Sequence, residues 1–157
     1  MKAIHSMIAA LALAFVLPAP ADAATTDPEV IIYRFPGVRD DGGASGVGIA
    51  TVFHCTNFSG ATETLRFVTR QFSGALLQNN TATINHLATK TAVTHAVFAY
   101  AEDPILATGE VIQGTTAIAA TSINIICTAM TIDAANLKPD GVALRGIRFS
   151  PVPGSQE

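Results

Sequence analysis

The chain has 157 residues, with nine Lys and Arg against twelve Asp and Glu, so its formal net charge is −3. Charged residues make up 13% of it, against about 25% in an ordinary soluble domain, and it holds two cysteines and no tryptophan. This composition excludes a basic nucleic-acid-binding protein, a charge-rich disordered chain, a cysteine-dense small scaffold and a long coiled coil. It does not name an activity.

The first 23 residues have the pattern of a secretory signal peptide. Lys2 precedes an uninterrupted apolar run, Met7–Leu17, and the small residues of Ala21-Asp22-Ala23 follow. That run has eleven residues, whereas a membrane-spanning helix needs about 20, and no later run is longer. We therefore expect export to the periplasm or the medium, no membrane span, and one domain at 24–157. We expect no lipid anchor either, because no cysteine lies near the cleavage point.

The residues after position 23 favour strands over helices. Forty of them are Val, Ile or Thr, whereas nineteen are Leu, Met, Glu, Lys or Gln, and branching at Cβ suits a pleated surface. Alternating runs bounded by turn residues predict, in chain order, strands at Val30–Phe35, Val47–Thr56, Thr62–Phe72, Ala75–Gln78, Thr81–Leu87, Thr91–Ala101, Thr115–Ala119, Ile123–Ile132 and Val142–Phe149. Seven to nine short strands are typical of an all-β antiparallel sandwich.

Three segments interrupt this pattern. Asp133–Leu137 is the one helix-like stretch, long enough for a single turn, and 151–157 reads as a loose tail rich in Pro, Gly and Ser. In the last strand, Val142 and Leu144 share one face whereas Ile147 and Phe149 share the other. We therefore predict a β-bulge at Gly146, where the alternation switches.

The two cysteines are expected to form a disulfide. Alternation places Cys55 on the same face as Phe53, and Cys127 on the same face as Ile125, so both thiols point toward the interior. An exported chain folds in an oxidising compartment, where two cysteines usually pair, and we expect the bridge to join the two sheets. Two buried free thiols are the alternative, while a separation of 72 positions is unlike the close spacing of catalytic dithiols.

The placement of one cysteine in an early strand and one in a late strand resembles that of the disulfide in an immunoglobulin-like sandwich. Two hallmarks of true immunoglobulin domains are missing: no tryptophan is present, and Ile125 stands where the corner tyrosine would be. The resemblance therefore implies the architecture and not membership of the family.

Three segments also resemble a group of small, uncharacterised, secreted bacterial proteins. They are FHCTN at 53–57, CTAMTIDAA at 127–135 and GIRFSPVPGSQE at 146–157. The resemblance spans nearly all of 24–157 and implies an exported β-rich domain. It brings no activity, cofactor or catalytic residue.

Known catalytic motifs are incomplete in this sequence. Gly43–Val47 begins like a nucleophile elbow but lacks its final glycine, and no Gly-Lys-Ser/Thr follows the glycines of 42–48. The three histidines of the domain, His54, His86 and His95, have none of the close spacings of a metal site. We predict no catalytic residue, no metal and no cofactor.

Adjacent carboxylates do not change that expectation. On extended chain the side chains of Asp40 and Asp41 diverge, as do those of Glu102 and Asp103. Both pairs lie in loops, which favour such residues for their turn geometry.

Arginine is the one residue type whose placement is informative. Arg66 and Arg70 alternate with inward residues, and Arg145 and Arg148 both face outward if Gly146 is a bulge. In an immunoglobulin-like layout the strands that carry them flank the Cys127 strand. The four arginines then frame one solvent face, whose floor is Asn124, Ile126 and Thr128. Because guanidinium groups bind carboxylate, phosphate or sulfate, we expect a surface for an anionic ligand or a partner, the alternative being an ordinary solvated face.

Two classes of function remain, with a third as a variant. The favoured one is an exported, non-catalytic module that binds or packs, with a protein or a glycan as its partner. The second is a secreted hydrolase with an unrecognised site, for which a histidine bonded to a carboxylate inside a cleft would be the sign. The third is a subunit of a surface assembly built by strand exchange through Val30–Phe35 or Ile123–Ile132, if either lies at a sheet edge.

Overall fold

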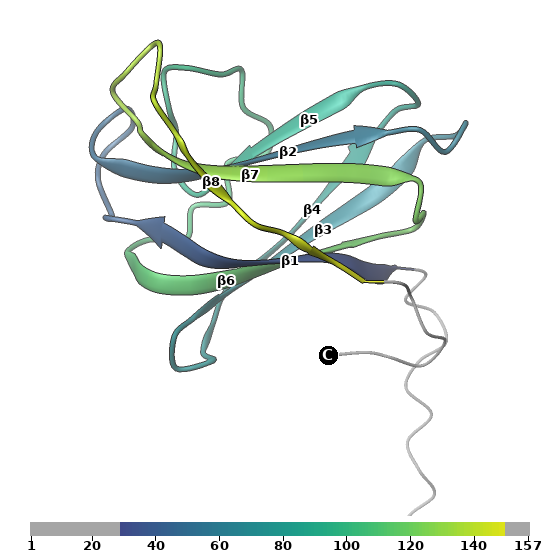
Figure 1. Cartoon of the computed structure of the whole chain (residues 1–157), viewed down its shortest axis with the longest axis horizontal. Coiled ribbons are helices and arrows are strands. Elements are labelled where there is room, and N and C mark those ends of the chain that lie inside the picture. Colours follow the sequence, from purple (N-terminus) through teal and green to yellow (C-terminus); the bar gives the residue numbers. More distant parts are fainter. Residues whose placement is uncertain (1–28, 150–157) are drawn as a thin grey trace, which may run out of the picture.

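This computed structural model describes residues 29–149, which contain nine strands and no helix (Figure 1). In chain order they are β1 (Val30–Asp40), β2 (Ile49–Asn57), β3 (Glu63–Gln71), β4 (Leu76–Ile84), β5 (Thr89–Val93), β6 (Val111–Ala120), β7 (Ile125–Asp133), β8 (Val142–Leu144) and β9 (Ile147–Arg148). None of the described residues belongs to a helix that is long and apolar enough to cross a membrane.

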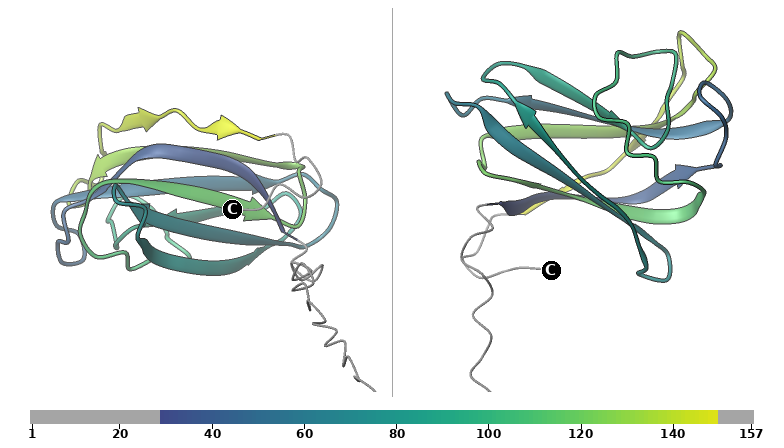
Figure 2. Two further views of the ribbon diagram at one scale, coloured as in Figure 1. Left: turned by 90° about the horizontal axis from the view of Figure 1, so that it is seen from below. Right: turned by 180° about the vertical axis from the view of Figure 1, so that it is seen from behind.

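The strands form two antiparallel sheets that pack face to face. One sheet has the order β4-β3-β6-β1-β9 and the other the order β5-β2-β7-β8. Figures 1 and 2 show them as two layers, with the chain passing repeatedly from one to the other. The predicted all-β sandwich of seven to nine strands is confirmed.

The main core lies between the two layers. Alternating residues of β2 and β3 supply Phe53, Leu65 and Phe67, all fully buried, as the period of two requires. The rings of Phe35, Phe53 and Phe67 follow one another through the core at centroid distances of 5.8 and 6.1 Å. The first contact is edge to face and the second is tilted, and such aromatic contacts are favourable beyond the area that they bury.

A second, smaller core lies on the outer face of the four-stranded sheet. The predicted strand Thr91–Ala101 leaves the sheet after Val93, and its continuation covers this face. Val97 packs there on Ala50, Val52 and Ile132, which are buried although they lie on the face opposite the main core. The four-stranded sheet is therefore apolar on both sides at this end.

The disulfide between Cys55 and Cys127 is confirmed, but the prediction that it joins the two sheets is wrong. The two residues are register partners on β2 and β7, which are neighbours in the four-stranded sheet, with Cα atoms 4.1 Å apart. An inward direction for both thiols fits a bridge across the sandwich and also a bridge between adjacent strands. The alternation of the sequence does not distinguish the two.

The predicted bulge at Gly146 is also wrong, although the switch of faces is real. β8 pairs with β7 in one sheet and β9 pairs with β1 in the other, so the chain crosses between the sheets at Arg145 and Gly146. Figure 1 shows this segment in yellow, descending from one layer to the other. Gly146 lies against the ring of Phe35, where a Cβ atom would be 2.3 Å from a ring carbon.

Other boundaries differ from the prediction as well. β4 is one continuous strand through Asn79 and Asn80, where two strands were expected, because cross-strand pairing with β3 overrides the weak strand preference of Asn. The single helical turn expected at Asp133–Leu137 is absent, since β7 extends to Asp133 and a turn follows. The predicted tail at 151–157 and the predicted signal peptide at 1–23 lie outside the described residues.

Candidate functional site

Arg66 and Arg70 point outward from β3, as predicted. Leu65, Phe67 and Thr69 between and beside them are fully buried, so the arginines lie on the outer face of the five-stranded sheet. Arg66 forms an ion pair there with Glu29. The predicted floor of this face is wrong, however, because Ile126 and Thr128 belong to β7 in the other sheet.

Arg145 and Arg148 do not share one surface with Arg66 and Arg70. Arg148 lies on β9, separated from β3 by β1 and β6, and its Nη2 donates a 2.6 Å hydrogen bond to the carbonyl of Ile123. Its guanidinium also lies 5.7 Å from the centroid of the Tyr33 ring. Arg145 is exposed in the crossing between β8 and β9. Of the strands predicted to flank the Cys127 strand, β8 does so, whereas β3 and β9 lie in the other sheet, so the predicted arginine face is wrong.

Arg34 is the arginine that the sequence reasoning missed. It lies on β1, opposite Ala117 of β6, which is in turn opposite Val68 of β3, and therefore shares the outer face with Arg66 and Arg70. Its guanidinium lies 5.6 Å over the ring of Phe149. The signal was available, since Arg34 alternates with the inward residues Tyr33 and Phe35.

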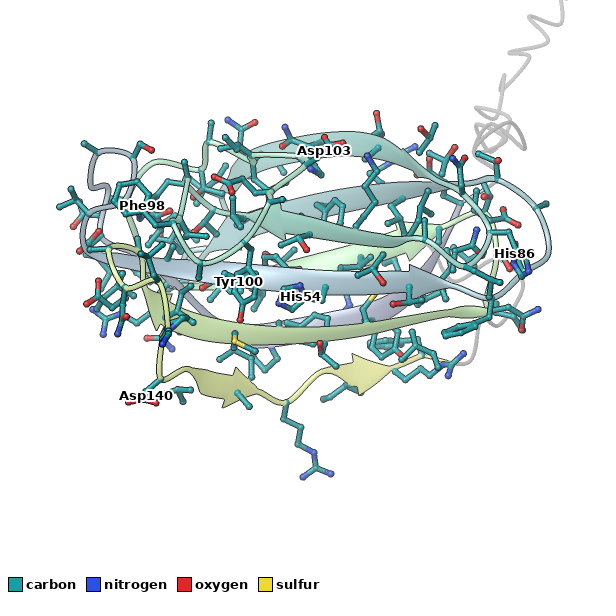
Figure 3. The ribbon with its side chains drawn as sticks, turned by 90° about the horizontal axis from the view of Figure 1, so that it is seen from above. His54, His86, Phe98, Tyr100, Asp103 and Asp140 are labelled. Carbon is teal, nitrogen blue, oxygen red and sulfur yellow. A yellow bond between two sulfur atoms is a disulfide. The ribbon has the colours of Figure 1, made fainter. Side chains whose placement is uncertain are left out.

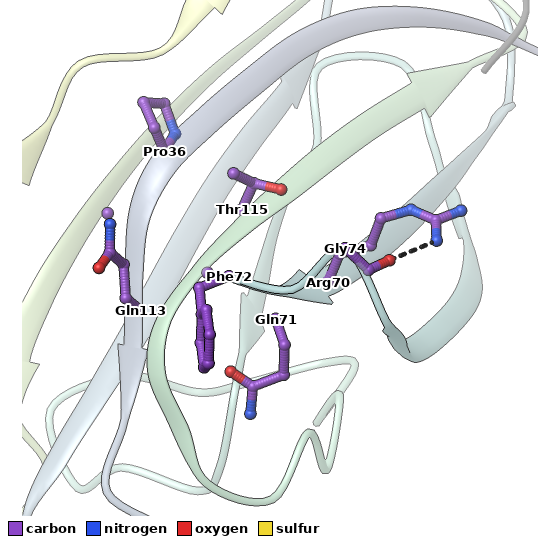
Figure 4. A pocket seen from close by; sticks show the side chains of 9 residues that line it. Pro36, Arg70, Gln71, Phe72, Gly74, Gln113 and Thr115 are labelled. Carbon is purple, nitrogen blue, oxygen red and sulfur yellow. Dashed lines mark hydrogen bonds between the residues drawn. The ribbon is translucent and has the colours of Figure 1, made fainter.

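A groove opens at the end of this outer face, beside Arg70 (Figure 4). Its volume is about 340 Å³, near the lower end of the range for small-molecule sites. Neighbouring parts of β3, β6 and β1, with the turn after β3, form its lining: Pro36, Gly37, Arg70, Gln71, Phe72, Gly74, Gln113, Gly114 and Thr115.

The groove combines an apolar surface with fixed polar groups. Phe72, directly after β3, is 74% exposed at its rim. Arg70 Nη1 donates a 3.0 Å hydrogen bond to the carbonyl of Gly74, and Gln71 Nε2 donates one of 2.8 Å to the carbonyl of Glu110. These bonds hold the guanidinium and the amide in place, with Arg70 turned toward Gly74 (Figure 4). Of the four predicted arginines, Arg70 alone lines the groove.

His54 and His86 lie far apart and form no joint site. Figure 3 places His54 in the middle of the outer face of the four-stranded sheet, next to Tyr100, and His86 at one end of the sandwich. His54 Nδ1 lies 3.0 Å from Thr91 Oγ1, and its ring meets that of Tyr100 edge to face. Because half-burial disfavours the charged form, the pKa of His54 is lowered from its ordinary value of 6.5.

His95 forms the one histidine–carboxylate pair among the described residues. Its Nδ1 lies 2.8 Å from Oδ2 of Asp40, whose carboxylate is almost fully buried, and its Nε2 lies 3.1 Å from the carbonyl of Val47. Asp41 lies beside this pair, with one ligand atom from each of the three residues within 4.8 Å of the others. These are the residue types of a metal site, and of a hydrolase.

The hydrogen bonds of this cluster are directed at the protein itself. Asp40 Oδ1 accepts from the amide of Gly42 at 2.7 Å, and the two oxygens of Asp41 accept from the amides of Gly43 and Ile49. The bond from Ile49 is the main reason why the pKa of Asp41 lies below its ordinary value. Both ring nitrogens of His95 face protein acceptors as well. The cluster therefore closes the β1–β2 loop onto the segment after β5, and no atom of it lines the groove.

Glycine at position 48 is part of this closure. Gly48 has φ +79° and lies under the Asp41 carboxylate, whose Oδ2 would be 1.9 Å from a Cβ atom. Any side chain would displace the carboxylate and strain the backbone. The glycines of 42–48, which complete no known catalytic motif, thus shape a specific loop.

Comparison of this chain with protein-family models, with curated proteins and with solved structures finds no match in any of the three.

Proposed function

We propose that this chain is an exported, non-catalytic binding module, and that it binds a saccharide with an acidic group in the groove beside Arg70. The observation that carries the proposal is that one groove of about 340 Å³ is lined both by the exposed ring of Phe72 and by Arg70, whose guanidinium is hydrogen-bonded to Gly74. An aromatic ring left in water at such a place is a candidate contact surface rather than part of the core.

The signal-like first 23 residues support export. So does the disulfide, because such bridges persist in the periplasm and outside the cell and are rare in the cytosol. The group of secreted proteins that the sequence resembles fits the same location.

The lining of the groove favours a saccharide over an apolar ligand. A sugar ring has an apolar face that packs on a phenyl ring, and hydroxyl groups that bond to amides and hydroxyls such as those of Gln113 and Thr115. A carboxylate or sulfate on the sugar suits the planar donors of Arg70. Phosphate groups alone would leave the Phe72 ring unused.

The hydrolase alternative has less support. It needs a histidine whose second nitrogen is free to take a proton inside a cleft. His95 is bonded through one ring nitrogen to the carboxylate of Asp40, as a catalytic histidine often is. Its other nitrogen faces the Val47 carbonyl, however, and His95 does not line the groove.

The test is binding to arrayed neutral and uronic-acid oligosaccharides, followed by calorimetry with the tightest ligand. We expect the wild-type protein to prefer acidic sugars. Phe72→Ala should weaken binding about tenfold, because the lost contact is that of one large apolar side chain. Arg70→Gln should abolish the preference for acidic over neutral sugars.

Phe58→Ala is the matched control, because Phe58 is a half-exposed phenylalanine outside the groove. It should leave binding unchanged. Failure to bind any saccharide on the array contradicts the proposal, as does equal loss of affinity in the Phe72 and Phe58 variants.

A further inference from the structure

The edges of the two sheets differ in how they are protected. β5 is covered by the segment that follows it, through hydrogen bonds from Asp103 N to Thr91 O, from Val93 N to Pro104 O and from Leu106 N to Val93 O, at 2.7 to 3.1 Å. β8, at the other edge of the four-stranded sheet, has three residues. β9, at one edge of the five-stranded sheet, has two. Covered and very short edges are two ways in which proteins avoid pairing with other strands.

β1 and β7, the strands that the sequence reasoning considered for exchange, are not edges. Each has a neighbour on both sides, and β1 is also broken where it would be open. Pro36 lacks an N–H group, and the register shifts between Pro36 and Val38.

β4 lacks every one of these protections. It runs for nine residues, Leu76–Ile84, and among the described residues β3 is its one strand neighbour. Its sequence, LLQNNTATI, holds no charge and no proline. The side chain of Gln78 reaches the carbonyl of Ala107, but no backbone hydrogen bond from that segment to β4 is present. An edge of this length without charge, proline or cover is a template for another strand.

The backbone groups that face outward follow from the register. Thr121 N donates to Thr64 O at 3.1 Å, so the backbone of Thr64 faces β6, and the next residue, Leu65, faces β4 by alternation. Leu65 is paired with Ala82, whose backbone therefore faces β3.

The alternate residues of β4 then face away from the sheet. They are Asn79, Thr81 and Thr83, and each presents one N–H and one C=O group at the edge. All three side chains are exposed and uncharged. A strand that pairs here therefore meets regular backbone groups and no charge.

We propose that β4 pairs in antiparallel fashion with β4 of a second copy of this chain, across a two-fold axis. The pairing joins two five-stranded sheets into one. An identical strand is a suitable partner because β4 is uncharged, so that two copies meet without repulsion between like charges.

The pairing register in which all nine residues of the two strands overlap also favours a second copy of β4 as the partner. It places Asn80 of one copy opposite Asn80 of the other, and Asn79 opposite Thr81, which are pairs that can form hydrogen bonds. Asn80 Oδ1 is buried and has no hydrogen-bond partner among the described residues. After a rotation of the amide, the Nδ2 group of the facing Asn80 supplies the missing donor.

Exposed apolar residues lie at the two ends of the same edge. Leu76, at the start of β4, is 51% exposed, and Leu87, just beyond its end, is 65% exposed. Leu87 also holds the left-handed conformation, with φ +61°, which a leucine rarely adopts. Antiparallel pairing brings Leu76 of one copy to the same end as Leu87 of the other, at both ends of the dimer. The contact is small, and we expect a concentration-dependent dimer in the micromolar range.

Sedimentation velocity of the purified protein across a concentration series tests the proposal. The weight-average mass should rise from monomer to dimer. Asn79→Lys, which places like charges across the new pairing, should weaken the dimer at least about tenfold. Thr128→Lys is the matched control, because it adds the same charge at an exposed site on the other sheet, and it should leave the dimer unchanged.

A second variant tests the proposal independently, in case Asn79→Lys does not fold. Thr81→Pro removes an edge N–H that β3 does not use, and it should abolish dimerisation while the thermal unfolding curve stays cooperative. A protein that stays monomeric at all concentrations overturns the proposal, and so does a dimer that both edge variants leave intact. Neither outcome depends on whether the groove at Phe72 binds a saccharide.

Discussion

At the scale of single residues, the contact between Gly146 and Phe35 sets what the crossing between the sheets can tolerate. Phe35 is 1% exposed and held in the aromatic row of the core, so its ring has no room to move away from a new side chain. The left-handed backbone that constrains many other glycines is absent here. Steric space is therefore the whole reason for glycine at this position.

We predict that Gly146→Ala lowers the free energy of unfolding by about 1–3 kcal/mol, the usual cost of overpacking a core. Urea denaturation measures it. Arg145→Ala, one residue away and exposed, should change stability by less than about 0.5 kcal/mol. Equal stability of the two variants would show that the ring yields.

His54 gives the fold a dependence on pH. Burial lowers its pKa in the folded state below 6.5, whereas the unfolded chain takes up the proton at the ordinary value. The unfolded state therefore binds more protons in the window below 6.5. Stability from this group is present above that value and is lost as the pH falls through the folded pKa.

We predict that the melting temperature of the wild-type protein falls between about pH 7.5 and about pH 5, and that His54→Gln reduces this fall. The variant keeps a polar partner for Thr91 and removes the titration. His86→Gln, at an exposed position, is the matched control, and the fall should shrink more in the His54 variant than in this one. An unchanged dependence in the His54 variant would rule out this histidine as its source.

At the scale of elements, the disulfide ties β2 to β7 inside one sheet. These strands are already paired over nine residues, from Ile49 opposite Asp133 to Asn57 opposite Ile125. The bridge therefore adds little to the folded sheet and acts mainly on the unfolded chain, where it closes a long loop.

Replacing both Cys55 and Cys127 by alanine should lower the free energy of unfolding by about 4 kcal/mol, the chain-entropy value for a loop of 72 residues. Chemical denaturation checks it. Adding a thiol reductant should destabilise the wild-type protein and leave the double variant unaffected. A double variant as stable as the wild type contradicts this entropic account.

The second core explains why the alternation in β2 is less regular than its sequence suggests. Ala50, Thr51, Val52 and Phe53 are all buried, because Phe53 faces the main core while Ala50 and Val52 lie under the segment after β5. Thr51 is satisfied there by the backbone of Arg39 and by Thr94. A strand covered on both faces loses the pattern of period two that identifies strands in a sequence.

At the scale of the whole molecule, alternation and turn residues were enough to predict the class of fold. They also predicted the inward direction of Cys55 and Cys127 and the outward direction of Arg66 and Arg70. Each of these follows from local chain geometry, since the face of a strand is decided by residues two positions apart.

The order of the strands was beyond such local reasoning. Whether β3 lies beside β6 or β7 depends on the packing of the entire chain, so the arginine face was assembled from the wrong neighbours. The groove was missed for the same reason, because Phe72, Gln113 and Pro36 meet through the adjacency of β3, β6 and β1. Phe72 at the end of a strand was the one local sign of it.

The segment Val142–Phe149 closes one side of both sheets at once, since β8 lies along β7 and β9 along β1. Arg145, midway along it and exposed, is a natural target for a trypsin-like protease. A single cut there would free the end of β8 and the start of β9 together. Damage at one peptide bond would thus loosen both layers in one event.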